Sequence, residues 1–316
     1  MCWVVEYFDG ISWEDRNILH QILNGLLKGL KDPAIPVQNA AACSFRTLVT
    51  SEGAQDLLKP VLFDILKEYF RIINEAESPD SVISALQAII MQFGSDLVPM
   101  AAAMTEQLVS VFVNYSNDNN EDLDDDEAAF TASNTLDTIS SLIEACQDSP
   151  ETLLQIEKLM LPTISRVMSG EGACFEYLDC ILEMMSFFTY SSSKITPEMF
   201  EFCGPLLKAM SEWACDYFND LMMPLMNFIL KEPQLFISSS YCGASHVDVL
   251  LTTISKALQE RDDEYESDAK ASAILLTSFL LCTKGLISSC LPSLLQVCYP
   301  YKTFIPLPFT TFYYTS

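Results

Sequence analysis

The chain has 316 residues, of which half are hydrophobic, 19% are charged and only ten are glycine. This composition can supply a large apolar core and argues against a sheet protein with many tight turns. The formal charge of −26 repels nucleic acid and anionic lipid and favours basic partners, so nucleic-acid binding is not expected.

The first predicted helices lie before residue 31. Met1–Phe8 has an apolar helical pattern with no capping residue before it, so we expect this end to have been cut from a longer helical array. Neither the basic region nor the long apolar core of a signal peptide is found there. A second, amphipathic helix is predicted over Asn17–Leu30. Its expected buried side consists of Ile18, Ile22, Leu26, Leu27 and Leu30.

Two prolines lead into the next predicted helix, Gln38–Leu48. Proline is tolerated in the first turn of a helix, and the small residues after Pro36 let two helices approach closely. Asp32-Pro33 and the following alanines resemble the HEAT-repeat signature. Gln38 stands where that signature usually has a basic residue, so we expect the ladder of Asp and Arg between repeats to be absent at this joint.

The clearest helical pattern covers Gln55–Tyr115. Apolar residues recur there at spacings of three and four in three stretches, separated by breaks at Ala76–Asp80 and Phe93–Asp96. Helical hairpins of this kind cannot close a core alone and must stack on their neighbours. The sequence therefore predicts an all-α fold, a HEAT-repeat-like right-handed α-solenoid of about six or seven helical hairpins.

An acidic stretch interrupts this pattern after residue 116. It contains no basic residue, and repulsion between its carboxylates should keep it extended and solvated. We therefore expect hairpins over residues 1–116, an acidic loop over 117–127, a second group of hairpins over 128–299 and an irregular tail over 300–316. The acidic residues of the loop are Asp118, Glu121, Asp122, Asp124, Asp125, Asp126 and Glu127.

Within the second group, Pro197–Met210 should pair with Trp213–Leu230. Val247–Leu258 and Lys270–Thr283 should flank a second acidic run at Glu260–Glu266. The most apolar part of this region has about a dozen residues, where a membrane span needs about twenty, so membrane insertion is not expected.

Eleven cysteines are scattered through the chain without a C-x-x-C pair. Most lie among helix-period apolar residues, where cysteine behaves as a small hydrophobe. We expect buried, reduced thiols in a reducing compartment, and neither a disulfide framework nor a metal site. The cysteines are Cys2, Cys43, Cys146, Cys174, Cys180, Cys203, Cys215, Cys242, Cys282, Cys290 and Cys298.

Several stretches resemble the importin-β superfamily of karyopherins, and within it the importin seven and importin eight branch. The resemblance covers about residues 1–299, and its specificity comes from the order and spacing of the stretches. The stretches are Leu66–Glu75, Phe93–Pro99 and Met104–Leu108 before the acidic loop, and Glu176–Glu183, Ile195–Met199 and Asp216–Leu225 after it.

The resemblance implies the C-terminal half of a longer superhelix that carries basic cargo, such as histones and ribosomal proteins, between cytoplasm and nucleus. It implies no enzymatic activity and no cofactor. In the full-length family, the partners include nucleoporins and the GTPase Ran, whose principal binding surface lies in amino-terminal repeats outside the resembling region.

The expected cargo-binding residues are the seven acidic residues of the 117–127 loop and Trp213. A charge run is most often a solvated spacer between helices, but the negative charge and the importin resemblance favour contact with basic cargo on an acidic concave face. Trp213 follows an acidic residue, and an exposed Trp beside an acid can receive a Lys or Arg side chain. The alternative for Trp213 is an ordinary place in the core.

Catalytic groups are few. His20 is expected on the polar side of its helix, and Ser245 and Asp248, next to His246, are better explained as a helix start than as a catalytic triad, because adjacent residues point in different directions. No phosphate-binding glycine loop occurs. An importin-like receptor fragment is the leading hypothesis. The alternatives are a HEAT-repeat scaffold without a transport role and, with less support, an enzyme with an unrecognised site.

Overall fold

The computed structural model describes residue 5 and residues 15–51, 53–76, 78–116, 125–170, 172–259 and 266–287. Most of Met1–Phe8, residues 117–124 and 260–265 of the two acidic runs, and everything from residue 288 onward lie outside these ranges. The described part is almost entirely helical, which confirms the all-α solenoid prediction. It forms two compact units, residues 1–167 with 171–191 (unit 1) and residues 168–170 with 192–316 (unit 2).

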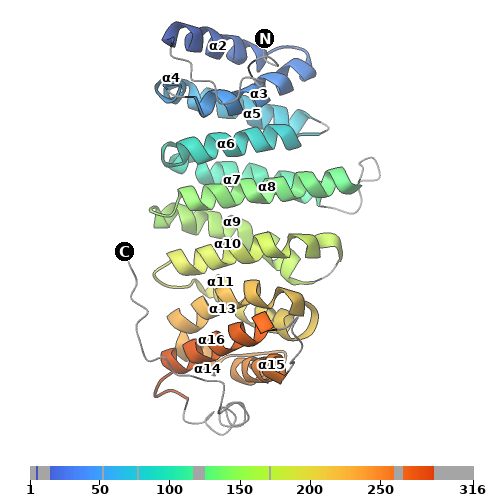
Figure 1. Cartoon of the computed structure of the whole chain (residues 1–316), viewed down its shortest axis with the longest axis vertical. Helices are drawn as coiled ribbons and strands as arrows, with labels where there is room; N and C mark the ends of the chain where they lie inside the picture. Colours follow the sequence, from blue (N-terminus) through green and yellow to red (C-terminus); the bar gives the residue numbers. More distant parts are fainter. Residues whose placement is uncertain are drawn as a thin grey trace. The chain divides into compact units, whose positions relative to one another are not determined.

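Unit 1 is a stack of helical hairpins arranged in two rows (Figure 1). We call α3, α6, α8 and α10 the front row, because each packs on the next. The back row is α5, α7 and α9, and α2 packs on α3. The bounds are α2 Arg16–Gly29, α3 Ile35–Val49, α4 Gln55–Leu58, α5 Leu62–Glu75, α6 Asp80–Leu97, α7 Ala101–Tyr115, α8 Asp125–Ala145, α9 Pro150–Met168 and α10 Leu178–Ser191, with short 3-10 turns at Lys59–Val61, Val98–Met100 and Gly172–Tyr177.

The apolar stripes of the helices meet between the two rows and form the core of unit 1. Tyr69 of α5 is fully buried, packs edge-on against Phe45 of α3, and donates a hydrogen bond from its hydroxyl to the Ala42 carbonyl at 2.5 Å. One expected core residue is misplaced, because Ile18 is 43% exposed and Leu19 and Leu23 are buried instead. The handedness of the stack stays a prediction.

Close contact between α6 and α8 depends on one glycine. A Cβ atom built on Gly94 would lie 2.6 Å from the Cβ of Ala145, which is closer than real Cβ contacts come. The backbone of Phe93, just before it, leaves helical geometry and kinks α6. The last turn of α6 can therefore lie directly against the last turn of α8.

The first contact between neighbouring repeats contains an arginine that the sequence pattern did not predict there. Arg71 of α5 pairs with Glu68 at 2.8 Å and with Glu75 at 2.7 Å, and it donates to the Leu30 carbonyl at 2.9 Å and to Gln38 Oε1 at 3.3 Å. The basic residue missing at position 38 is thus replaced by an arginine from the following hairpin. Neighbouring repeats are tied together in this way without the expected ladder.

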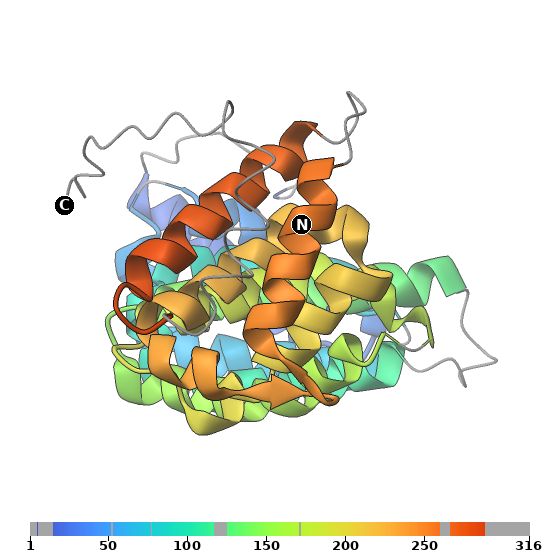
Figure 2. The ribbon, with the colours of Figure 1, turned by 90° about the horizontal axis from the view of Figure 1, so that it is seen from below.

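Unit 2 has shorter helices and one small hairpin. Its elements are α11 Pro197–Phe200, α12 Cys203–Lys208, a π-turn Ala209–Trp213, a 3-10 turn Cys215–Tyr217, α13 Phe218–Lys231, α14 Pro233–Ser238, β1 Ser240–Tyr241, β2 Ala244–Ser245, α15 His246–Gln259 and α16 Glu266–Cys282. The last helix, α16, packs on α13 and α15 (Figure 2).

Two features of unit 2 differ from the sequence prediction. The helix expected over Pro197–Met210 is broken between α11 and α12, because Pro205 has no N–H to donate to the carbonyl of Glu201. The antiparallel pair of β1 and β2 was not foreseen, since each strand has only two residues. Its turn consists of Cys242 and Gly243, both with positive φ, as a two-residue hairpin turn requires.

The predicted grouping of hairpins on either side of the acidic loop stays a prediction. The helices on either side of that loop, α7 and α8, pack closely against each other within unit 1. The contacts divide the chain near Ser192. A run of like charges thus lengthens a connection without separating the helices that it joins.

By length and composition alone, the run Asp80–Tyr115 is long and apolar enough to cross a membrane. It consists of two helices, α6 and α7, with a 3-10 turn between them, and half of its most apolar window is buried inside the protein. Its apolar residues are therefore explained by the core of unit 1.

Candidate functional site

Three of the acidic residues predicted to bind cargo are helical. Helix α8 begins at Asp125, so Asp125, Asp126 and Glu127 form its first turn and do not belong to a loop. Negative side chains are favourable at a helix N-terminus, where the backbone N–H groups are unpaired, and this offsets their mutual repulsion. Of the predicted set, Asp118, Glu121, Asp122 and Asp124 lie outside the described residues.

The start of α8 lies against the start of α6. The hydroxyl of Ser78 donates a hydrogen bond to the Glu127 carboxylate. Burial, with the nearby charges of Glu127 and then Asp80, raises the pKa of the Tyr115 phenol. The carboxylates of Asp80 and Glu127 are far apart in the sequence, but both therefore lie near Tyr115, where α6 and α8 begin.

Three helices of the front row, α6, α8 and α10, share this acidic character. No Lys, Arg or His occurs in α6, α8 or α10, whereas α2, α5 and α9 of the same unit each contain basic residues. We call the carboxylates of these three helices the acidic face. Its members with described side chains are Asp80, Asp96, Asp126, Glu127, Asp137, Glu144, Asp179 and Glu183.

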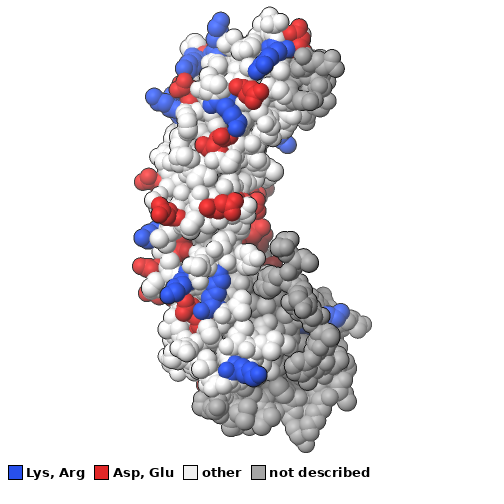
Figure 3. All heavy atoms as spheres, turned by 90° about the vertical axis from the view of Figure 1, so that its left-hand side faces the viewer, with Lys and Arg blue, Asp and Glu red and all other residues white. Residues whose placement is uncertain are grey.

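Figure 3 shows basic and acidic side chains mixed over much of the surface turned toward the viewer. Acidic side chains gather along its right-hand edge at mid-height. In unit 1, Lys59 forms an ion pair with Asp96 of the acidic face at 3.0 Å, while Lys31 and Arg71 pair with Glu68 and Glu75 of α5. The three helices of the acidic face thus supply no basic residue of their own that would neutralise these carboxylates.

The middle of the acidic face is the contact between α8 and α10. The thiol of Cys180 donates to Asp137 Oδ1 at 3.7 Å. Partial burial raises the pKa of Asp137, with a further contribution from Asp179, although the thiol contact acts in the opposite direction. Burial, followed by the charges of Asp179 and Asp137, raises the pKa of the Cys180 thiol to about 12. Both shifts come mainly from burial, and the neighbouring carboxylates add to them.

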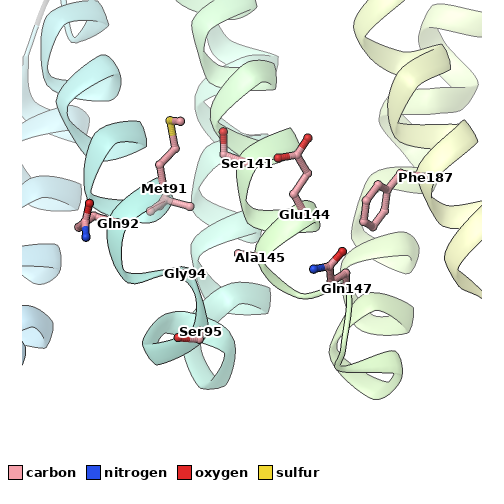
Figure 4. Close-up of a pocket in the computed structure, with 10 residues that line it drawn as sticks. Met91, Gln92, Gly94, Ser95, Ser141, Glu144, Ala145, Gln147 and Phe187 are labelled. Atoms are coloured by element: carbon pink, nitrogen blue, oxygen red, sulfur yellow. The ribbon is translucent and has the colours of Figure 1, made fainter. Parts of the chain in front are cut away.

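An open groove of about 610 Å³ lies at the far end of the acidic face (Figure 4). It runs across the last turns of α6 and α8 and reaches α10. Glu144 and Phe187 lie on opposite sides of its α8–α10 part, and Met91 and Ser141 line the part between α6 and α8. The lining residues are Ile90, Met91, Gln92, Gly94, Ser95, Ser141, Glu144, Ala145, Gln147 and Phe187.

Trp213, the other predicted contact, lies in unit 2 and is half-buried at the end of the π-turn. Its indole ring covers Gly170, where a Cβ atom would come within 3.0–3.2 Å of three ring carbons. Gly170 also has a φ of +68°, which favours glycine. Trp213 therefore has a packing role, and it lies in a different unit from the acidic face.

The two histidines lie where the sequence places them, outside any triad. His20 is exposed, and Ser245 Oγ accepts a hydrogen bond from the Asp248 backbone N–H at 3.2 Å, which caps α15. His246 is buried beside Phe236 and Phe200, and burial lowers its pKa. Among the described residues, no group of three His, Cys, Asp or Glu side chains could hold a metal ion.

The seven cysteines whose side chains are described are all free thiols. Cys146 and Cys203 are buried as expected, and burial raises the pKa of both thiols. Cys215 and Cys242, in contrast, are exposed. Both lie in turns of unit 2, where the apolar helical period on which the expectation of burial was based does not apply.

The stacked hairpins define an α-solenoid in which three neighbouring front-row helices carry carboxylates and no basic residue. The chain is 25% identical over 296 residues to the importin beta-like SAD2 homolog of Arabidopsis thaliana, covering 93% of this chain and 28% of that protein. It is 26% identical over 299 residues to human importin-8, covering 94% and 28%. To the probable importin-7 homolog of Dictyostelium discoideum it is 24% identical over 296 residues, covering 94% and 27%.

These relatives confirm the resemblance to the importin-β superfamily. The chain spans little more than a quarter of the length of each of them. No family model and no solved structure matches the chain.

Proposed function

We propose that this chain is part of an importin-type nuclear transport receptor and that its acidic face holds basic cargo proteins. The observation that carries the proposal is the absence of any basic residue from three successive front-row helices that carry nine carboxylates. The similarity to importins over more than nine-tenths of the chain supports the transport role. A HEAT-repeat scaffold would share the fold but would not require a surface on which all charged side chains are negative.

Exposed carboxylates act mainly on the rate of encounter. They attract a cationic partner over roughly a Debye length, about 8 Å at physiological ionic strength, and raise the association rate. The residues Asp118, Glu121, Asp122 and Asp124 directly precede α8 in the chain and would add four charges to the same end of the face. We therefore propose them, with Asp125, Asp126 and Glu127, as part of the cargo-binding surface.

The proposed cargo consists of histones, ribosomal proteins or other strongly basic proteins, carried between cytoplasm and nucleus. Nucleoporin contacts and regulation by Ran would belong to the longer receptor of which this chain resembles a part. Trp213 is proposed as a separate contact in unit 2, through the part of its ring that Gly170 leaves uncovered.

The test is a binding titration of the purified chain with a histone H3–H4 tetramer, repeated at several salt concentrations. An acidic protein of similar size serves as the control. We expect binding of the histone only, with an association rate that falls steeply as the salt concentration rises. Equal binding of both proteins, or a rate independent of salt, would contradict the cargo assignment and favour the scaffold.

Transport itself requires a separate measurement. Permeabilised cells are supplied with labelled histone, GTP-loaded Ran and this chain fused to the missing length of a related importin. Nuclear accumulation of histone above the level without the fusion is the expected result. If nuclear accumulation does not change when the carboxylates of the acidic face are neutralised, transport does not depend on this surface.

A further inference from the structure

We propose that the groove at the end of the acidic face binds an arginine side chain presented by an extended segment of the basic partner. This inference rests on the proposed function, and it assigns a specific pocket to a surface that otherwise attracts cations only in general. Glu144, Phe187 and Met91 would be its contact residues (Figure 4).

The first argument is the electrostatic environment of the groove. Glu144 is exposed in the last turn of α8, and no described Lys or Arg lies within ion-pair distance of it. Helices α6 and α8 both end at this groove, and neither has a basic residue in its last turn. The negative ends of two helix dipoles and the Glu144 carboxylate thus act together there, while Asp96 in the last turn of α6 is paired with Lys59 at 3.0 Å.

The second argument is the chemistry of the walls. Phe187 of α10 presents an aromatic ring opposite Glu144, and Met91, which is 76% exposed, supplies a flexible apolar wall. A cation held over an aromatic ring and paired with a carboxylate gains from both contacts, and an apolar wall can cover its aliphatic stem.

The choice of arginine over lysine follows from shape. A guanidinium group is planar, stacks on an aromatic ring and donates two parallel hydrogen bonds to a carboxylate, whereas an ammonium group acts as a point charge. Gln147 and Ser141 line the same groove and offer further oxygen acceptors for the remaining N–H groups. The volume of about 610 Å³ exceeds that of one side chain and leaves room for the neighbouring residues of an extended segment.

The test uses a fluorescent peptide with a single arginine among lysines, derived from a histone tail that binds the chain. Three variants are compared with the unchanged chain: Glu144→Gln, Phe187→Leu and, as a matched control, Glu106→Gln. Glu106 is an exposed carboxylate of α7, in the same unit but on the back row. We expect Kd to rise about tenfold for Glu144→Gln and about threefold for Phe187→Leu, but by less than about twofold for Glu106→Gln.

A second peptide with citrulline in place of arginine shows whether the contact is direct. If arginine occupies the groove, the citrulline peptide binds the unchanged chain and Glu144→Gln with similar Kd values, because the partner of the carboxylate is already lost. Equal losses from Glu144→Gln and Glu106→Gln for the arginine peptide would overturn the groove assignment and leave the cargo function standing. Failure of the unchanged chain to bind any histone-derived peptide at low salt would instead overturn the proposed function.

Phe187→Leu keeps most of the apolar volume. Comparing its unfolding curve with that of Glu144→Gln shows whether a loss of binding comes from a loss of stability.

A peptide in which lysine replaces the arginine adds a third measurement. Its Kd should be insensitive to Phe187→Leu if stacking of the guanidinium is the reason for the preference. An equal effect of Phe187→Leu on both peptides would show that the pocket does not select arginine.

Discussion

The two rows of helices in unit 1 have similar cores but differ in the distribution of their surface charges. Front-row and back-row helices both bury apolar residues at spacings of three and four. In the back row, Arg71 of α5 forms ion pairs with Glu68 and Glu75, while α6, α8 and α10 have carboxylates and no basic residue. The comparison shows that the buried apolar residues determine the fold of such a stack, while the function of a row depends on its exposed residues.

The largest expected effect tests this contrast directly. A variant with Asp137→Asn, Asp179→Asn and Glu183→Gln removes three charges from the front row. Its association rate with a basic partner at low salt should fall by about tenfold, because steering depends on the summed field. Stopped-flow or surface-based kinetics measure this rate.

The matched control removes the same number of charges from exposed positions on the back row. Asp64→Asn, Glu106→Gln and Glu151→Gln change the net charge identically but act on α5, α7 and α9. Its association rate should fall much less. Equal losses in the two triple variants would mean that total charge, and not the acidic face, attracts the partner.

Gly94→Val tests the packing that holds the front row together. The added side chain meets Ala145 and must push α6 away from α8, so the free energy of unfolding should fall by about 1–3 kcal/mol. Denaturant titration measures this change, and Ser95→Val, at an exposed neighbouring position, is the control. A stable Gly94→Val protein would show that the two helices can separate without loss.

Arg71→Met removes the charges that tie the first repeats together. The carbonyl of Leu30 and the carboxylate of Glu68 lose their donor, and we expect the free energy of unfolding to fall by about 1–2 kcal/mol, since Arg71 is partly exposed and its ion pairs are screened. Thermal unfolding at two salt concentrations checks the result. A loss of stability that occurs only at low salt would indicate that the ion pairs of Arg71, and not its hydrogen bond to the Leu30 carbonyl, account for the effect.

The smallest expected effect is a dependence on pH. Because the pKa of Asp137 is raised, the folded protein holds this proton to a higher pH than the unfolded chain does. The free energy of unfolding should therefore fall slightly as the pH rises from about 4 through the folded-state pKa of Asp137. Asp137→Asn should flatten this part of the curve, and an unchanged slope would assign it to other carboxylates.

Much of the fold could be predicted because apolar periodicity directly reports which side of a helix is buried. The helices over Gln55–Tyr115 illustrate this, with breaks close to where the sequence puts them. The start of α8 at Asp125 was missed, because repulsion among carboxylates was considered without the unpaired N–H groups of a helix N-terminus. The broken helix at Pro205 was missed as well, although the lost N–H donor could have indicated it.

The candidate site was predicted less well than the fold. The sequence analysis placed the acidic residues in one loop, whereas the described carboxylates are distributed over three helices that only stacking brings together. The absence of basic residues from α6, α8 and α10 was a readable signal, but it becomes a surface only when the front row is known. The contact between Trp213 and Gly170 depends on a π-turn and a positive φ, and the sequence gives little indication of either.

The raised pKa of Cys180 has a practical consequence for labelling. At neutral pH its thiol is almost wholly protonated, so maleimides and iodoacetamides, which react with thiolates, should modify it very slowly. Cys215 and Cys242, in contrast, are exposed to solvent. A fluorophore can therefore be attached in unit 2 while the thiol at the centre of the acidic face stays unmodified, which makes binding by that face measurable without altering it.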